Sequence, residues 1–172
     1  RLQGDWSSDV CSSDLGEVGE TTLKALRASG GDNALLFKLK TGGASSETTH
    51  GQGVSSKGAA ASDEMAKADT QRLLKYKQNF ITVAHKYKLP PALLAAITSR
   101  ETRGGTQLDR RGYSIWDGDG FGLMQVDRNY HKPKGGPGDI DQISQAASIL
   151  ADFRDQARDR KSTRLNSSHL VI

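Results

Sequence analysis

The sequence predicts an α+β fold that is predominantly helical, with a small β-hairpin region. Three observations support this prediction. Between residues 70 and 87, apolar side chains recur at helical spacing, at Leu73, Phe80, Ala84 and Tyr87. Pro90 and Pro91 then end this helix and begin the stretch 91–102, which is nearly all apolar until Ser99 and predicts a buried helix. Residues 107–127 alternate turn-forming glycine and aspartate with short β-prone runs, a pattern typical of a small hairpin.

The two ends of the chain do not resemble coding sequence. The N-terminal peptide DWSSDVCSSDL and the C-terminal peptide DRKSTRLNSS can be encoded by opposite strands of one oligonucleotide, which resembles a sequencing adapter. We therefore expect residues 1–15 and 159–172 to be artefactual tails. Residues 16–158 are then a genuine domain that is incomplete at its C-terminus. The single cysteine, Cys11, lies in the first tail and supports no disulfide or metal site.

The segments before the helices have a less regular pattern. Residues 16–40 have an ambiguous pattern, in which Leu35, Leu36, Phe37 and Leu39 fit either a short strand or a helix end. Residues 41–57 are rich in Gly, Ser and Thr, which predicts a loop. A helix is expected to begin near Ser62, a candidate N-cap, because Asp63 and Glu64 follow it and negative charge favours a helix N-terminus.

The later elements have clearer boundaries. The apolar helix 91–102 is expected to end at Gly104-Gly105. Asp139 is a candidate cap for a last helix, whose apolar face is expected to comprise Ile140, Ile143, Ala147, Leu150 and Phe153. No apolar run approaches the roughly 20 residues of a membrane-spanning helix. The two tails carry formal charges of −2 and +2, so residues 16–158 keep the net charge of +4. This charge is compatible with binding to an anionic polymer, but many other proteins share it.

Glu101 is the most informative residue for function. Leu94, Ile97 and Glu101 lie at positions i, i+3 and i+7, so we expect the carboxyl to project from the buried face of its helix. A carboxyl held against apolar surface has its charged form disfavoured. A glycosidase needs such a carboxyl, still protonated near neutral pH, to protonate the leaving oxygen. The alternative is a solvated glutamate at a helix end.

The turn-rich segment supplies candidate partners for that acid. Asp117 and Asp127 can assist a water molecule or stabilise an oxocarbenium-like transition state, whereas Asp119 is better explained as a turn former. Gly120 and Gly122 are typical of positions where backbone or ligand approaches closely. A calcium-binding EF-hand is disfavoured, because the order of its ligands and its closing glutamate are missing.

The order of several motifs resembles goose-type (g-type) lysozyme. The motifs are SRE at 99–101, GG at 104–105, GFGLMQVD at 120–127 and YHKP at 130–133. Upstream, TGGAS at 41–45, YK at 76–77 and PALLA at 91–95 continue the likeness, which covers about residues 41–158.

This resemblance implies a lysozyme-like fold that hydrolyses the β-1,4 bond between N-acetylmuramic acid and N-acetylglucosamine in bacterial peptidoglycan. It implies antibacterial cell-wall lysis with no cofactor and no metal, and chitooligosaccharides as further ligands. By resemblance Glu101 is the general acid of an inverting mechanism, and Asp127 positions or activates water. Asp117 is assigned to the family's other aspartate, although the surrounding loop differs in length. Gln125 and His131 match sugar-contacting positions.

The resemblance further implies a secreted monomer with no nucleic-acid or membrane partner. Two alternatives stay open. A lytic transglycosylase shares the fold and a single catalytic glutamate but forms an anhydro ring without water. A non-catalytic cell-wall or chitooligosaccharide-binding fragment is the second alternative, because the family continues after the equivalent of residue 158 with a Tyr-Asn-Ala-Gly element that lines its cleft.

Overall fold

The computed structural model describes residues 42–50 and 54–167. The predictions for residues 1–15 and 16–40 lie outside the described residues, as do the last five residues of the chain. The described elements are α4 (Ser46–His50), α5 (Ala59–Leu74), α6 (Lys77–Tyr87), α7 (Pro91–Thr102), β1 (Gly120–Phe121), β2 (Val126–Asp127) and α8 (Ile140–Ser167). The prediction of a mostly helical α+β fold with a small β region is confirmed.

The helix predicted from Ser62 begins three residues earlier, at Ala59. Ala44 and Gly58 pair as an isolated antiparallel bridge, so the chain is already placed for a helix directly after Gly58. The Ser62 hydroxyl does not cap α5; it lies within the helix and accepts a hydrogen bond of 3.0 Å from the Ala44 amide. The loop expected over residues 41–57 is also interrupted, because residues 46–50 form the short helix α4.

The periodic stretch from residue 70 to residue 87 forms two helices rather than one. The Tyr76 amide donates to the Leu73 carbonyl at 2.9 Å, which closes a tight turn after α5. Phe80 then donates to the carbonyl of Tyr76, and α6 continues from there. The apolar spacing is kept across this break, since Phe80, Val83 and Ala84 are all buried.

The proline pair acts as the sequence predicts. Pro90 has an extended backbone with ψ of 130° and precedes α7, and Pro91 occupies its first turn. The helix ends at Thr102, just before the predicted Gly104-Gly105 stop, because Arg103 already adopts a left-handed conformation with φ of 53°.

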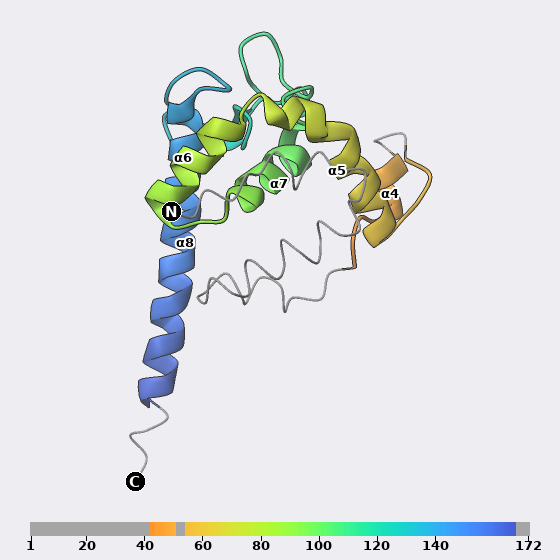
Figure 1. Ribbon diagram of the computed structural model, residues 1–172. Helices are drawn as coiled ribbons and strands as arrows, with labels where there is room; N and C mark the ends of the chain where they lie inside the picture. The colour runs from red at the N-terminus through yellow and green to blue at the C-terminus, as the bar shows by residue number, and fades with distance from the viewer. Residues whose placement is uncertain (1–41, 51–53, 168–172) are drawn as a thin grey trace. The chain divides into compact units, whose positions relative to one another are not determined.

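Helix α7 is the central element of the core. It packs against α5 and against α6, and α6 packs in turn against α8 (Figure 1). Fully buried apolar side chains come from each of these packed layers and from the turn between the strands: Ala61, Ala84, Leu94, Leu123, Ile143 and Ala147.

The β region is small and sits between α7 and α8 in the sequence. β1 and β2 are antiparallel, with Gly120 opposite Asp127 and Phe121 opposite Val126. Isolated bridges join Leu108 to Ser114 and Tyr113 to Phe121, so the hairpin expected over residues 107–127 is mostly irregular turn.

The predicted apolar face of the last helix is only partly buried. The Asp139 carbonyl accepts a hydrogen bond from the Ile143 amide, consistent with its predicted place at the start of α8. Ile143 and Ala147 are fully buried, but Ile140 is 41% exposed and Phe153 is 63% exposed. Ala151 is the last α8 residue in the buried core, although Arg154 still donates to the carbonyls of Tyr87 and Lys88 at 2.9 and 3.1 Å. Figure 1 shows the helix continuing past α6 toward the C-terminus. Among the described residues, no helix is long and apolar enough to cross a membrane.

Candidate active site

A hollow of about 690 Å³ lies between α7, β2 and α8, and we call it the site hollow. It contains three of the predicted site residues, Gln125, Asp127 and His131. The remainder of its lining is mostly apolar and comprises Ile97 of α7, Met124, Val126, Tyr130 and, from α8, Ala146, Ile149, Leu150 and Phe153. A mostly apolar surface with a few polar groups is the usual composition of a small-ligand site.

The backbone around β2 positions the three polar residues. Gln125 has φ of 51°, an uncommon conformation for a residue other than glycine, and its amide Nε2 donates to the Gly122 carbonyl at 2.9 Å. The Asp127 carboxylate accepts a hydrogen bond of 2.7 Å from the Asn129 amide. The His131 amide donates to the Asp127 carbonyl at 2.9 Å, so a single turn brings Asp127 and His131 to the same hollow.

Glu101 is exposed, which contradicts the expectation that its carboxyl projects from the buried face of the helix. The buried residues of α7 are Leu94, Ala95, Thr98, Ser99 and Thr102. This stripe follows the i, i+4 spacing from Leu94, whereas Glu101 follows from Ile97, which is only half-buried. The same spacing places Glu101 one helical turn beyond Ile97, on the side of α7 that borders the site hollow.

Asp117 lies in an exposed turn and does not line the site hollow. Its carboxylate accepts a hydrogen bond of 3.0 Å from the Asp119 amide, a local pattern typical of aspartate in turns. This bond, with help from the Ser114 hydroxyl, holds the pKa of Asp117 below its ordinary value. Asp119 forms an ion pair with Arg128 at 3.3 Å, in keeping with the structural role expected for it.

The two glycines of the GFG motif accommodate protein side chains. A Cβ on Gly120 would lie 2.2 Å from Oε1 of Gln125, and a Cβ on Gly122 would lie 2.4 Å from Cδ of Gln142. Gln142 is fully buried, and its Nε2 donates to the Phe121 carbonyl at 3.1 Å. The close approach predicted at these two glycines is therefore made by protein side chains, Gln125 beside Gly120 and Gln142 of α8 beside Gly122.

A buried ionic cluster that the sequence does not predict lies beside α7. Asp69 of α5 is 0% exposed and forms ion pairs with Arg72 and Arg103. The Ser99 hydroxyl donates to its carboxylate at 2.7 Å. Burial opposes ionisation, but the hydrogen bonds from Arg103, Ser99 and Arg72 outweigh it and hold the pKa of Asp69 below its ordinary value. A buried aspartate in an otherwise polar stretch of α5 has no periodic signal that would reveal its partners.

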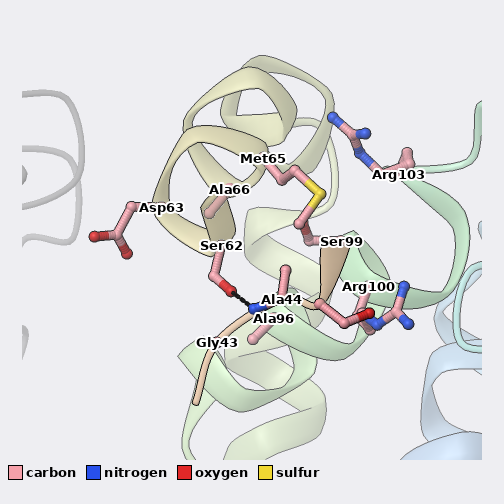
Figure 2. A pocket seen from close by; sticks show the side chains of 11 residues that line it. Gly43, Ala44, Ser62, Asp63, Met65, Ala66, Ala96, Ser99, Arg100 and Arg103 are labelled. Carbon is pink, nitrogen blue, oxygen red and sulfur yellow. Dashed lines mark hydrogen bonds between the residues drawn. The ribbon is translucent and has the colours of Figure 1, made fainter. Parts of the chain in front are cut away.

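A second hollow, of about 600 Å³, lies on another side of α7. Figure 2 shows Ser99 and Arg100 of α7 and the following Arg103 around it, with Ser62, Met65 and Ala66 of α5 opposite. It contains none of the predicted site residues. The two hollows lie along different faces of α7, so Arg100 and Glu101, although adjacent in sequence, belong to different surroundings.

The site hollow can bind an uncharged, partly apolar ligand and present a carboxylate, an imidazole and an amide to it. Glu101 adds a second carboxyl from the end of α7. Most glycoside hydrolases use a pair of carboxyl groups that flank the scissile bond. Asp127 lines the site hollow, whereas Glu101 is not among its lining residues and is placed near it only through Ile97, one helical turn earlier. Within residues 42–50 and 54–167, no group of three His, Cys, Asp or Glu side chains that could hold a metal is present.

Comparisons with known proteins agree on one family. The family model described as Lysozyme g matches residues 35–170. A lysozyme g of Cyprinus carpio is 39% identical over 119 residues, covering 68% of this chain and 62% of that protein. A lysozyme g of Gallus gallus is 36% identical over 137 residues, 79% of this chain and 64% of its own length. For a lysozyme g of Struthio camelus, the identity is 38% over 113 residues, and the shares are 66% and 54%.

This chain thus spans about 54–64% of the length of these three curated relatives. The family match passes residue 158, where the sequence analysis expects the second tail to begin, and α8 also continues to Ser167. The domain boundary at residue 158 stays a prediction.

Proposed function

We propose, from the premise that this chain belongs to the lysozyme g family, that the protein hydrolyses the β-1,4 bond between N-acetylmuramic acid and N-acetylglucosamine in bacterial peptidoglycan. The observation that carries the proposal is the site hollow, where Gln125, Asp127 and His131 meet beside the α7 face that bears Glu101. The expected consequence is lysis of the bacterial cell wall.

In this proposal Glu101 is the general acid that protonates the leaving oxygen. Because Glu101 is exposed in the free protein, we infer that a bound glycan covers it and excludes water from the leaving oxygen. The substrate, rather than the apolar core, then encloses the acid.

Asp127 is the better-placed carboxylate for orienting the attacking water, because it lines the site hollow and its loop is held by the Asn129 and His131 amides. Attack by water from the opposite face of the sugar gives inversion at the anomeric carbon. Asp117 has a lesser part in this proposal, since its carboxylate holds its own turn. Gln125 and His131 contact the sugar.

The test of the acid assignment is Glu101→Gln, which keeps the shape of the side chain and removes its proton-donating ability. Lysis of a bacterial suspension should be abolished, while binding of insoluble peptidoglycan should survive. Glu47→Gln is the matched control, because Glu47 is also an exposed helical glutamate but belongs to α4, which contributes no residue to the site hollow. Lysis retained in Glu101→Gln would overturn the assignment.

The nearest competing chemistry is lytic transglycosylation. Masses of the soluble products separate the two reactions, since hydrolysis adds one water per cleaved bond and anhydro-ring formation adds none. NMR of fresh product identifies the first anomer formed, and retention would contradict the inverting mechanism. Peptidoglycan binding by the unmodified chain without any soluble product would instead favour a non-catalytic binding fragment.

We further propose that the protein is secreted, acts as a monomer and binds chitooligosaccharides as well as peptidoglycan. Size-exclusion chromatography with light scattering tests the monomer, and calorimetric titration with a chitin hexamer tests the ligand. A Glu101→Gln protein that binds peptidoglycan but not the hexamer would show that the site requires the muramic acid substituent.

A further inference from the structure

The buried carboxylate of Asp69 connects two helices at the point where α7 ends. Its partners are Ser99 of α7, through a 2.7 Å hydrogen bond, and Arg103 directly after α7, whose Nε lies 2.9 and 2.8 Å from the two carboxylate oxygens. These residues stand two positions before and two positions after Glu101. Asp69 therefore contacts the chain on both sides of the proposed general acid.

Arg72 extends the connection along α5. It pairs with Asp69, and its Nε also donates to the carbonyl of Arg103 at 2.8 Å. The carbonyl groups at the end of a helix lack intrahelical donors. Arg72 supplies one of these missing donors where Arg103 turns into its left-handed conformation.

The opposite side of the same turn is held by the β region. The Thr102 hydroxyl lies 3.0 Å from the Leu123 carbonyl oxygen, and the Gly105 amide donates to that hydroxyl at 3.1 Å. Glu101 itself is exposed, but its neighbours Ser99, Thr102 and Arg103 are each bound to another element. The backbone that carries Glu101 is thus held by contacts of its neighbours.

The chemistry of this cluster is unusual for a contact that only stabilises the fold. A buried ion pair gives little net stability compared with apolar side chains of similar volume, because both charges lose water. A carboxylate held by donors from two helices does, however, restrict their relative position, since moving either one leaves a buried charge without partners.

We propose that Asp69 is a positioning residue for the general acid: it fixes the last turn of α7, and so the place of the Glu101 carboxyl relative to the site hollow. The inference rests on the proposed hydrolase function. Asp69 is fully buried and lines neither hollow, so it does not touch the glycan. Its effect is expected in kcat, with KM almost unchanged.

The test is Asp69→Asn, an isosteric change that removes the negative charge from between the two arginines. For turnover of soluble peptidoglycan fragments, normalised to folded protein, we expect kcat to fall by about tenfold or more and KM to change by less than about twofold. The matched control is Tyr87→Phe, which removes a part-buried hydrogen bond of 3.1 Å between α6 and α8 and is distant from the end of α7 in the sequence. Its kcat should match that of the unmodified protein.

A second readout does not depend on turnover. Amide hydrogen exchange in residues 99–105 should accelerate at least about tenfold in Asp69→Asn, and the Tyr87→Phe protein should show no such local change. If the unmodified protein cleaves no peptidoglycan, the proposed function fails while this measurement still judges the positioning role. If Asp69→Asn does not fold, Ser99→Ala replaces it in this measurement. Ser99→Ala removes one hydrogen bond to Asp69 but keeps both ion pairs, so a smaller acceleration of exchange in residues 99–105 is expected. Equal kcat in Asp69→Asn and Tyr87→Phe, or unchanged exchange in residues 99–105, would overturn the proposal.

Discussion

Substitution of Gly122 by alanine tests how closely α8 packs onto the β region. Gly122 has φ of +74°, and an added Cβ would lie 2.4 Å from Cδ and 2.5 Å from Cγ of Gln142. Gln142 is fully buried and is bound to the Phe121 carbonyl through its side chain, so it has little room to move.

Two separate costs contribute to the expected effect. The left-handed backbone costs an L-residue about 1–2 kcal/mol. Overpacking against a buried neighbour adds about 1–3 kcal/mol. Gly122→Ala should therefore lower the free energy of unfolding by about 2–5 kcal/mol, a large part of the roughly 5–15 kcal/mol typical of a domain.

Gly118→Ala is the matched control for the backbone cost. Gly118 has φ of +72°, but no atom lies within 4 Å of the place that a Cβ would occupy, so only the cost of about 1–2 kcal/mol should appear. Urea unfolding of both variants, followed by circular dichroism, gives the two free energies. The difference between them measures the packing of Gln142 against Gly122.

A double variant completes the test. Gln142→Ala alone loses the bond to Phe121, but combined with Gly122→Ala it makes room for the new methyl group. The double variant should therefore be more stable than the sum of the single losses predicts, by about 1–3 kcal/mol. Equal losses in Gly118→Ala and Gly122→Ala, or strict additivity with Gln142→Ala, would refute the close contact between α8 and the GFG turn.

Three further predictions concern the core and the buried charge. Leu94→Ala should lower the free energy of unfolding by about 2–5 kcal/mol in urea, because Leu94 is 0% exposed; a loss under about 1 kcal/mol would contradict the central place of α7. Phe153→Ser should change it by no more than about 0.5 kcal/mol, since Phe153 is 63% exposed, and a larger loss in thermal unfolding would show that the ring is covered in solution. The lowered pKa of Asp69 stabilises the fold above its unfolded-state pKa of about 3.9, and this stabilisation is lost as the pH falls through the folded-state value. The free energy of unfolding of the unmodified protein should therefore exceed that of Asp69→Asn by the same amount at pH 7 and pH 5, and by a smaller amount at pH 3. A difference that grows as the pH falls would contradict the lowered pKa.

Local sequence rules predicted most of the secondary structure. The proline pair before residue 92 determines where α7 begins, because proline is restricted to extended or first-turn positions whatever the rest of the fold does. The turn residues between α7 and α8 likewise predicted short strands and irregular backbone, since glycine and aspartate interrupt any longer pairing. The break at Tyr76 was not predictable, because the apolar spacing continues across it.

The predicted site residues also differ in how far local sequence determines their surroundings. Gln125, Asp127 and His131 lie within one short stretch, so a single turn brings them close together. The rest of the hollow that they line depends on the packing of α7 and α8. Asp117 lies outside that hollow, and its own turn explains its hydrogen bonds.

The sequence by itself determined which segment carries the candidate chemistry and which residue types are present there, because motif order and turn chemistry are local properties. The tertiary structure alone decided which stripe of α7 is buried. Leu94 is compatible with a buried stripe through Ile97 and Glu101 or with one through Thr98 and Thr102. The packing of α7 against α5 and α6, and the contact of Thr102 with Leu123, select the second stripe. That choice leaves Glu101 exposed and places Asp69, 32 residues earlier in the chain, against the turn that holds it. Spacing along one helix cannot encode either result, since both depend on which neighbours cover its faces.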